Sequence, residues 1–296
     1  MTVLLLATAT ACASGSSSTS AQSGSTSPTS ATTTGAPTTG NPVGIIAIGH
    51  SALTGENSDP GKPGVEVREN SWATGTNSAV DSIYQRMVAL RPETSGHVAN
   101  LAEGGAPAAR LADQAKQALA QVPAPALAII QTIDNDIRCD GTDASHVTEF
   151  GSQVSDALTV ITTASPGTRV LVLTQPGRPA AEITQMAPLI ASNPQVKENY
   201  TGPAPCGAFD PATGKPTPKN VASLTAIIEA YEAEQARVCA KFPACSTDLG
   251  KVHAFSHDPS VVSSDFNHLN IAGHTKIAAL VWPSAQAALA GATATP

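Results

Sequence analysis

Apolar and polar positions follow two alternating patterns from about residue 43 to the end of the chain. Short apolar runs, typical of strands buried on both faces, lie at 43–48, 98–102, 126–133, 169–174 and 252–255. Between them, apolar residues at helical spacing predict helices over 77–90, 108–121, 147–163, 221–240 and 271–290. This alternation predicts an α/β fold with a parallel sheet covered by helices on both faces. Residues 192–218, rich in Pro, Gly and Asn, are expected to form a long insertion.

The first part of the chain has a different composition. No Asp, Glu, Lys or Arg precedes Glu56, and residues 13–41 are almost entirely Ser, Thr, Ala, Gly and Pro. Such a segment cannot bury enough apolar surface to offset the entropy lost on ordering. We therefore interpret 13–41 as a disordered tether, with hydroxyl groups available for O-glycosylation, and 42–296 as the folded domain.

The tether follows a segment that resembles a bacterial export signal. A short apolar run precedes Ala9-Thr10-Ala11-Cys12, and small residues ahead of an early cysteine are similar to a lipobox, whose cysteine receives a lipid. The basic start of an ordinary signal and the usual Leu three residues before the cysteine are missing. We expect residues 1–12 to direct export and Cys12 to be lipidated, which gives a cell-surface lipoprotein or a secreted protein. The alternative is a free cysteine in a disordered tail.

Charge and aromatic content exclude some classes of partner. The net charge is −7, from 16 basic and 23 acidic residues, and no Lys/Arg-rich run occurs. Nucleic-acid binding needs clustered basic residues, and the two Trp, three Tyr and five Phe make poor base-stacking platforms. No apolar run reaches the ~18 residues of a membrane span. We expect no nucleic-acid partner, membrane contact only through a lipid anchor, and a monomer.

Four cysteines lie in the predicted domain: Cys139, Cys206, Cys239 and Cys245. An even number in an exported chain indicates disulfides, for which three connectivities are possible. We favour Cys239–Cys245, whose ring is short and contains Pro243, and by elimination Cys139–Cys206. A zinc site is the other use of four cysteines, but no CxxC pair occurs.

Two loops carry residues suited to nucleophilic catalysis. The first predicted strand runs into Gly49-His50-Ser51, which places a serine hydroxyl at the carboxyl edge of the sheet, where parallel folds bind ligands. Near the other end, Asp265-Phe266-Asn267-His268 precedes the last predicted helix. An Asp three residues before a His can hold its Nδ1–H, so that Nε2 can accept a proton.

These two loops resemble the first and last blocks of the SGNH (GDSL-type) hydrolase family, with His50 in place of the Asp of the Gly-Asp-Ser turn. The middle blocks follow in order at strand ends. Gly105, with Gly104 as the alternative, takes the place of the second block's glycine. In 133–136, Asn135 matches the third block, although Ile133 replaces its leading glycine. Ser71-Trp72-Ala73-Thr74-Gly75 also looks like a segment of exported actinobacterial members, without an assigned chemistry.

The resemblance implies a three-layer α/β/α sandwich with a flavodoxin-like sheet and a Ser51-His268-Asp265 triad. The backbone N–H groups of Ser51 and Gly105 and the side chain of Asn135 would hold the oxyanion. No cofactor or metal is needed. The expected substrate is a small acyl ester or an acylated glycan.

The same sequence allows other interpretations. The chain could be a surface-anchored glycan- or ligand-binding protein that keeps the fold without catalysis. An α/β-hydrolase esterase would require GxSxG, but Leu53 occupies the second glycine's place. Asp134, Asp136, Asp140 and Asp143 crowd one loop, but their spacing does not match an EF-hand, so we interpret them as solvated carboxylates or helix caps. We interpret His253, His257 and His274 as structural.

Overall fold

The computed structural model describes residues 41–194, 197, 206–210 and 212–291. The predicted export signal, the lipidation site at Cys12 and all but Asn41 of the predicted tether lie outside these residues.

Five parallel strands form one sheet in the order β2-β1-β3-β4-β5. This is the order of a flavodoxin-like fold, and the parallel α/β sheet predicted from the sequence is confirmed. The strands are β1 (Ile45–Gly49), β2 (Val98–Asn100), β3 (Leu127–Gln131), β4 (Arg169–Val172) and β5 (Cys245–Thr247).

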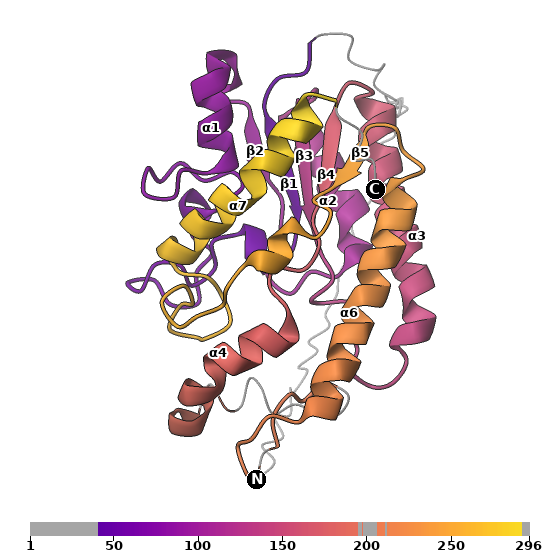
Figure 1. The fold of residues 1–296 in the computed structure, drawn as a ribbon. Coiled ribbons are helices and arrows are strands. Elements are labelled where there is room, and N and C mark those ends of the chain that lie inside the picture. The colour runs from indigo at the N-terminus through magenta and orange to yellow at the C-terminus, as the bar shows by residue number, and fades with distance from the viewer. Residues whose placement is uncertain (1–40, 195–196, 198–205, 211, 292–296) are drawn as a thin grey trace, which may run out of the picture. The chain divides into compact units, whose positions relative to one another are not determined.

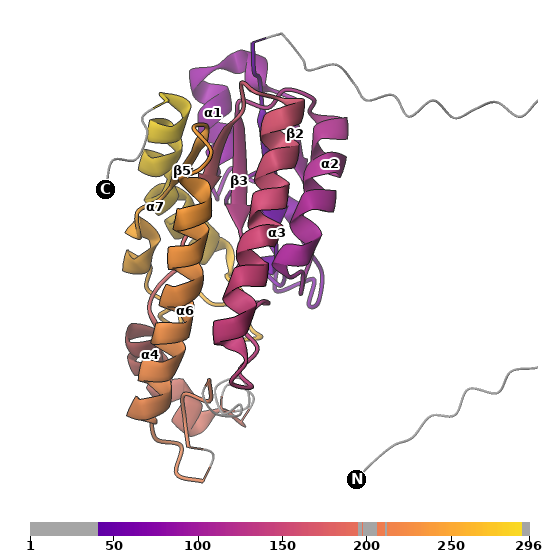
Figure 2. The ribbon, with the colours of Figure 1, turned by 90° about the vertical axis from the view of Figure 1, so that its right-hand side faces the viewer.

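Helices cover both faces of the sheet (Figures 1 and 2). On one face, α1 (Ile83–Leu90) and α7 (Ile271–Leu289) pack against alternate strand residues such as Ile45 and Ile129. On the other face, α2 (Leu111–Gln121), α3 (Asp143–Ala164) and α6 (Pro218–Cys239) cover Ile46 and Ile130. Successive strand residues enter opposite layers because side chains alternate across a strand. Of the helices in the described residues, none is long and apolar enough to cross a membrane.

A further helix, α4 (Pro179–Ser192), lies beyond the carboxyl ends of the strands beside the N-terminal part of α6 (Figure 1). This helix is absent from the elements predicted above. The sequence features that indicate it are Pro179 at the first helical position and the buried apolar residues Ile183, Met186 and Ile190.

Two sequence predictions need correction. The helix predicted over 77–90 begins only at Ile83, where Ser82 and Gln85 form a reciprocal capping box. The strand predicted over 252–255 is wrong, because 251–254 form a 3₁₀ helix and the fifth strand is Cys245–Thr247. Asp248 explains the difference, since its carboxylate accepts the N–H of Val252 at 3.0 Å, a group that a strand would use for pairing.

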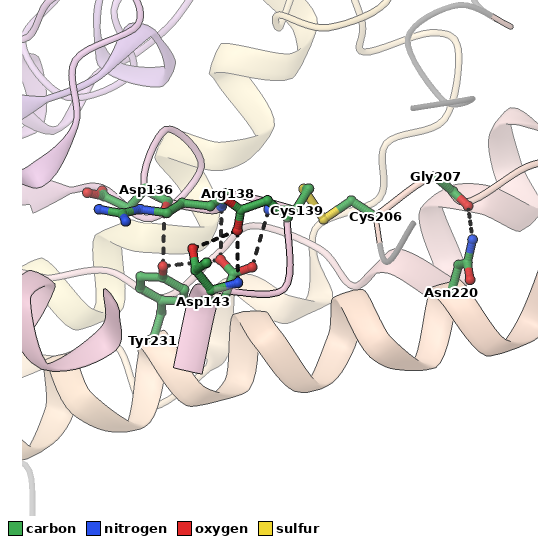
Figure 3. The surroundings of a disulfide bond; sticks show 10 residues. Asp136, Arg138, Cys139, Asp143, Cys206, Gly207, Asn220 and Tyr231 are labelled. Atoms are coloured by element: carbon green, nitrogen blue, oxygen red, sulfur yellow. Dashed lines mark hydrogen bonds between the residues drawn. A yellow bond between two sulfur atoms is a disulfide. The ribbon is translucent and has the colours of Figure 1, made fainter. Parts of the chain in front are cut away.

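Two disulfides join Cys139 to Cys206 and Cys239 to Cys245, the pairing favoured by the sequence. The first ties the loop after β3 to the segment ahead of α6 (Figure 3). The second joins the end of α6 to β5.

Candidate active site

Ser51 lies in a sharp turn directly after β1. Gly49 has φ +141°, and a Cβ there would lie 1.8 Å from the carbonyl oxygen of Gln131 on the neighbouring strand. Only glycine therefore fits at this position. Ser51 then begins a 3₁₀ turn (Ser51–Leu53), which His50 caps by accepting the N–H of Ala52 on Nδ1 at 3.3 Å. The turn presents Ser51 at the carboxyl edge of the sheet.

Three side chains from other elements hold this turn. Gln114 of α2 makes two hydrogen bonds to the Gly49 residue: Oε1 accepts its N–H at 2.7 Å and Nε2 donates to its carbonyl at 3.0 Å. Trp72 Nε1 donates to the Ala52 carbonyl at 2.9 Å, and Asn100 Nδ2 donates to the Leu53 carbonyl at 2.8 Å.

Gln114 is not among the candidate residues that the motifs indicate. It is a glutamine on the apolar stripe of a predicted helix, next to Leu111, Ala115 and Ala118, and it is fully buried. The segment 71–75, to which no chemistry was assigned, acts structurally here through Trp72.

Asp265 and His268 form a short hydrogen bond, with Asp265 Oδ2 2.6 Å from His268 Nδ1. The other carboxylate oxygen accepts the hydroxyl of Ser263 at 2.7 Å and the N–H of His268 at 3.0 Å. Asn57 Nδ2, which the sequence analysis also missed, donates to Oδ2 at 2.6 Å. Burial alone would raise the pKa of Asp265, but these hydrogen bonds hold its pKa well below the usual range. Asp265 therefore stays ionised beside the imidazole.

The His268 ring lies between two carboxylates. Its Nε2 is 3.4 Å from Glu56 Oε2, on the side opposite the Asp265 contact. Burial would lower the pKa of His268, but the hydrogen bond and charge of Asp265, with the charges of Glu56 and Asp134, raise that pKa above its ordinary value. Among the described residues, the Ser51 hydroxyl makes no hydrogen bond, and the contact of Nε2 is with Glu56.

Ser51, Asn135 and His268 line one pocket of about 450 Å³. Its walls combine apolar side chains, including Leu224 and Ile228 of α6, with polar groups of the loops at the strand ends. Asp265 and Gly105 are not among the lining residues. The structure thus brings the predicted nucleophile, base and amide donor to one cavity formed by segments far apart in the chain.

The backbone donors differ in availability. Gly104 N–H donates to Glu66 Oε1 at 2.9 Å, so it is already engaged. No described residue accepts a hydrogen bond from the N–H of Ser51 or of Gly105, and Gly105 has φ +72°, which favours glycine. Asn135 Nδ2 donates to the Ala106 carbonyl at 3.3 Å, which ties its loop to the Gly104-Gly105 loop and leaves its second N–H available. Of the two glycines, Gly105 keeps a free donor.

Ile133 has φ +101°, at the position where the family block carries glycine. A β-branched residue in this region is strained. Its side chain is fully buried, and its carbonyl accepts the N–H of Asp136 at 2.8 Å, so packing and hydrogen bonding hold it there. The loop therefore has a backbone suited to glycine, although glycine is absent.

The aspartates of the loop that follows have separate structural roles. Asp143 Oδ1 accepts the N–H of Arg138 at 2.9 Å and the hydroxyl of Tyr231 at 3.2 Å, and Oδ2 accepts the N–H of Cys139 at 3.2 Å (Figure 3). Asp136 is buried and accepts the N–H of Ala108 at 3.0 Å. In the described part of the chain, no group of three or more His, Cys, Asp or Glu is placed to hold a metal ion.

Asp140 and Asp134 lie nearer the surface. Asp140 accepts the N–H of Thr142 at 2.8 Å, and Asp134 Oδ2 is 3.6 Å from His50 Nε2. Burial lowers the pKa of His50, although the charges of Asp134 and Asp136 oppose this effect.

The three histidines interpreted as structural, His253, His257 and His274, occupy different environments. His253 Nε2 is 3.0 Å from Glu232 Oε1. His274 is buried in α7, and burial lowers its pKa to about 3, so it is neutral at pH 7. His257 lines the pocket, which the sequence analysis did not anticipate.

Comparison with known proteins adds limited information. No protein-family model and no curated protein matches the chain. Among solved structures, a protein of Parabacteroides merdae described as a GDSL-like lipase is 12% identical over 83% of this chain and 96% of its own, with a TM-score of 0.48. An extracellular lipase of Streptomyces rimosus is 14% identical over 82% and 99%, with a TM-score of 0.45. An acetyl xylan esterase is 14% identical over 82% and 99%, with a TM-score of 0.46. Similarity at this level assigns no activity to this chain.

Proposed function

We propose that this chain is a serine esterase of the SGNH type, which hydrolyses a carboxylic ester through Ser51, His268 and Asp265. One observation carries the proposal. A histidine whose Nδ1 is 2.6 Å from an ionised aspartate shares a pocket with a serine in a glycine-dependent turn at the carboxyl edge of a parallel sheet. A buried carboxylate that fixes an imidazole is the arrangement that general-base activation of a hydroxyl requires.

The reaction follows from the roles of these groups. His268 Nε2 accepts the proton of Ser51 Oγ while Oγ bonds to the ester carbonyl carbon, and Asp265 stabilises the imidazolium. The N–H groups of Ser51 and Gly105 and the Asn135 amide hold the negative oxygen. Collapse of the tetrahedral intermediate breaks the ester C–O bond, and the imidazolium protonates the departing alcohol. Water, deprotonated by His268, then releases the acid and restores Ser51.

The pocket suits a small acyl group. Its volume of about 450 Å³ and its apolar wall at Leu224 and Ile228 can accommodate a short chain, and its polar loops can accept a hydroxylated alcohol such as a glycan. The two disulfides favour an oxidising compartment, which supports an exported protein. A lipid on Cys12 and a monomeric state remain part of this proposal.

The second candidate is a binding protein on the same fold. The contact of His268 Nε2 with Glu56, instead of with Ser51, favours this candidate.

Hydrolysis of p-nitrophenyl acetate by the purified domain distinguishes the esterase from the binding protein. We expect wild-type turnover, loss of at least about 10³-fold in Ser51→Ala and in His268→Ala, and nearly unchanged thermal stability in both. Ser145→Ala, which alters an exposed serine of α3, is the matched control. Wild-type activity retained by Ser51→Ala, or absent from a folded wild type, would reject the esterase.

A further inference from the structure

Glu56 occupies the position at the His268 ring that the Ser51 hydroxyl needs. Its Oε2 is 3.4 Å from Nε2, and Glu56 lines the same pocket as Ser51 and His268. Nothing in the sequence marked this residue as part of the site. It comes five positions after Ser51 and three after Leu53, the last residue of the 3₁₀ turn.

The backbone around Glu56 is held in place. Its N–H donates to Thr54 Oγ1 at 3.2 Å, and Glu56 forms an antiparallel bridge with Glu66. The carboxylate lies against Gly104, where a Cβ would come within 2.9 Å of Oε2. The missing side chain of Gly104 therefore leaves the space that the carboxylate fills. The backbone and the carboxylate of Glu56 therefore both have contacts besides the one with His268.

The observed contact of Nε2 with Glu56 and the proposed one with Ser51 require opposite proton states of the ring. Nδ1 carries a proton toward Asp265, so the neutral ring has a lone pair on Nε2, which can accept from Ser51 but repels a carboxylate. The imidazolium has an N–H at Nε2, which donates to Glu56 and cannot take the proton of Ser51. Binding to Glu56 therefore stabilises the form of His268 that is inactive as a base.

We propose that Glu56 is a positioning residue that holds His268 in a resting, protonated state and thereby sets the pH below which Ser51 is not activated. As pH rises, His268 loses its Nε2 proton to solvent, the attraction to Glu56 ends, and Nε2 becomes free for Ser51. The link to Ser51 rests on the proposed esterase function, whereas the link between Glu56 and the protonation of His268 does not.

Several groups other than Glu56 act on the charge of His268. Asp265 lies on its own loop, and Asp134 comes from the loop after β3; both stabilise the imidazolium. Among the described residues, its charge also interacts with His50, which caps the 3₁₀ turn at Ser51, and with His274 of α7. Both of these rings have lowered pKa values and are neutral near pH 7. The negative groups therefore dominate, and Glu56 is the one that contacts Nε2.

The experiment measures the titration of His268 directly. In the Ser51→Ala protein labelled with ¹³C- and ¹⁵N-histidine, NMR follows the imidazole signal that disappears in His268→Ala. We expect Glu56→Gln, which removes charge with little change of shape, to lower the His268 pKa by about 0.5–1 unit, because the partly exposed carboxylate is screened by solvent. Glu56→Ala supplies the same test if the glutamine variant does not fold.

The matched control is Glu69→Gln, an exposed glutamate in the same segment with no side-chain hydrogen bond or ion pair to the described residues. It should leave the His268 pKa within about 0.2 unit of its starting value, since exposed charges are screened. An unchanged His268 pKa in Glu56→Gln, or an equal shift in Glu69→Gln, would overturn the proposal.

A kinetic measurement then tests the link to Ser51. With Ser51 present, the acid limb of kcat/KM for p-nitrophenyl acetate should move to lower pH in Glu56→Gln. One unit below the wild-type midpoint, this shift corresponds to an increase of about three- to fivefold relative to each protein's plateau. If the NMR titration shifts but no esterase activity exists, the proposed function fails while the Glu56–His268 link stands. If activity exists and its acid limb does not follow the NMR shift, the positioning role for Ser51 fails.

Discussion

Gln114 offers a test of whether the turn at Ser51 depends on a buried side chain of another element. In Gln114→Leu the volume changes little, but both hydrogen bonds to Gly49 are lost. The Gly49 carbonyl still accepts the N–H of Glu103 at 3.1 Å, whereas the Gly49 N–H loses its partner. A buried donor without a partner costs about 1–3 kcal/mol, and the lost carbonyl contact about 0.5–1.5 kcal/mol. The added apolar burial of leucine offsets part of this.

The expected net loss is therefore about 1–3 kcal/mol in the free energy of unfolding. Urea denaturation measures it as a lower midpoint with an unchanged m-value. Because the Gly49 peptide leads directly into Ser51, we also expect kcat for p-nitrophenyl acetate to fall by about tenfold or more, at a temperature where the variant remains folded.

Gln117→Leu is the matched control, since it makes the same chemical change on an exposed position one turn away in α2. Its unfolding free energy should stay within about 0.5 kcal/mol of wild type, and its kinetics should not change. If Gln114→Leu is as stable and active as Gln117→Leu, the inference that Gln114 holds the turn is wrong.

Two further predictions concern the loop after β3. Asn135→Ala should lower kcat by about 10²–10³-fold with a smaller effect on KM, as loss of one oxyanion donor does; a raised KM with an unchanged kcat would instead make Asn135 a substrate-binding residue. Cys139→Ser should lower kcat more than Cys245→Ser does, measured where both proteins are folded, because the first disulfide anchors the loop that carries Asn135. Equal kcat values in the two cysteine variants, or a peptide map that joins Cys139 to Cys245, would contradict this.

Much of the sheet was predictable because its strands are buried on both faces. The runs around β1, β3 and β4 contain continuous apolar residues, which are typical of strands in a parallel sheet covered by helices. The fifth strand, Cys245–Thr247, has only three partly buried residues, so it gave no such pattern. The apolar residues at 252–255 looked like a strand, but Gly250 with φ +72° and the Asp248 side chain turn the backbone into a 3₁₀ helix instead.

Some contacts of the candidate site are local in the sequence and could be predicted, whereas others join distant segments and could not. The spacing of Asp265 and His268 is local, so a loop of four residues can form their hydrogen bond, and the sequence alone indicated it. The position of Ser51 after the first apolar run was equally readable, since strand ends in a parallel sheet share one edge.

Only the tertiary structure placed Glu56 at Nε2 of His268, Asn57 at Asp265 and Gln114 at Gly49. The last two contacts span 208 and 65 positions of the chain, so no local spacing encodes them. They depend on how the loops at the strand ends and α2 pack against one another, which periodicity and motif do not specify. The sequence by itself determined which residue types stand at the edge of the sheet. Packing decided which of them meet. The proton state of His268 follows from this packing, because it depends on charges that the fold brings within a few ångströms of the ring.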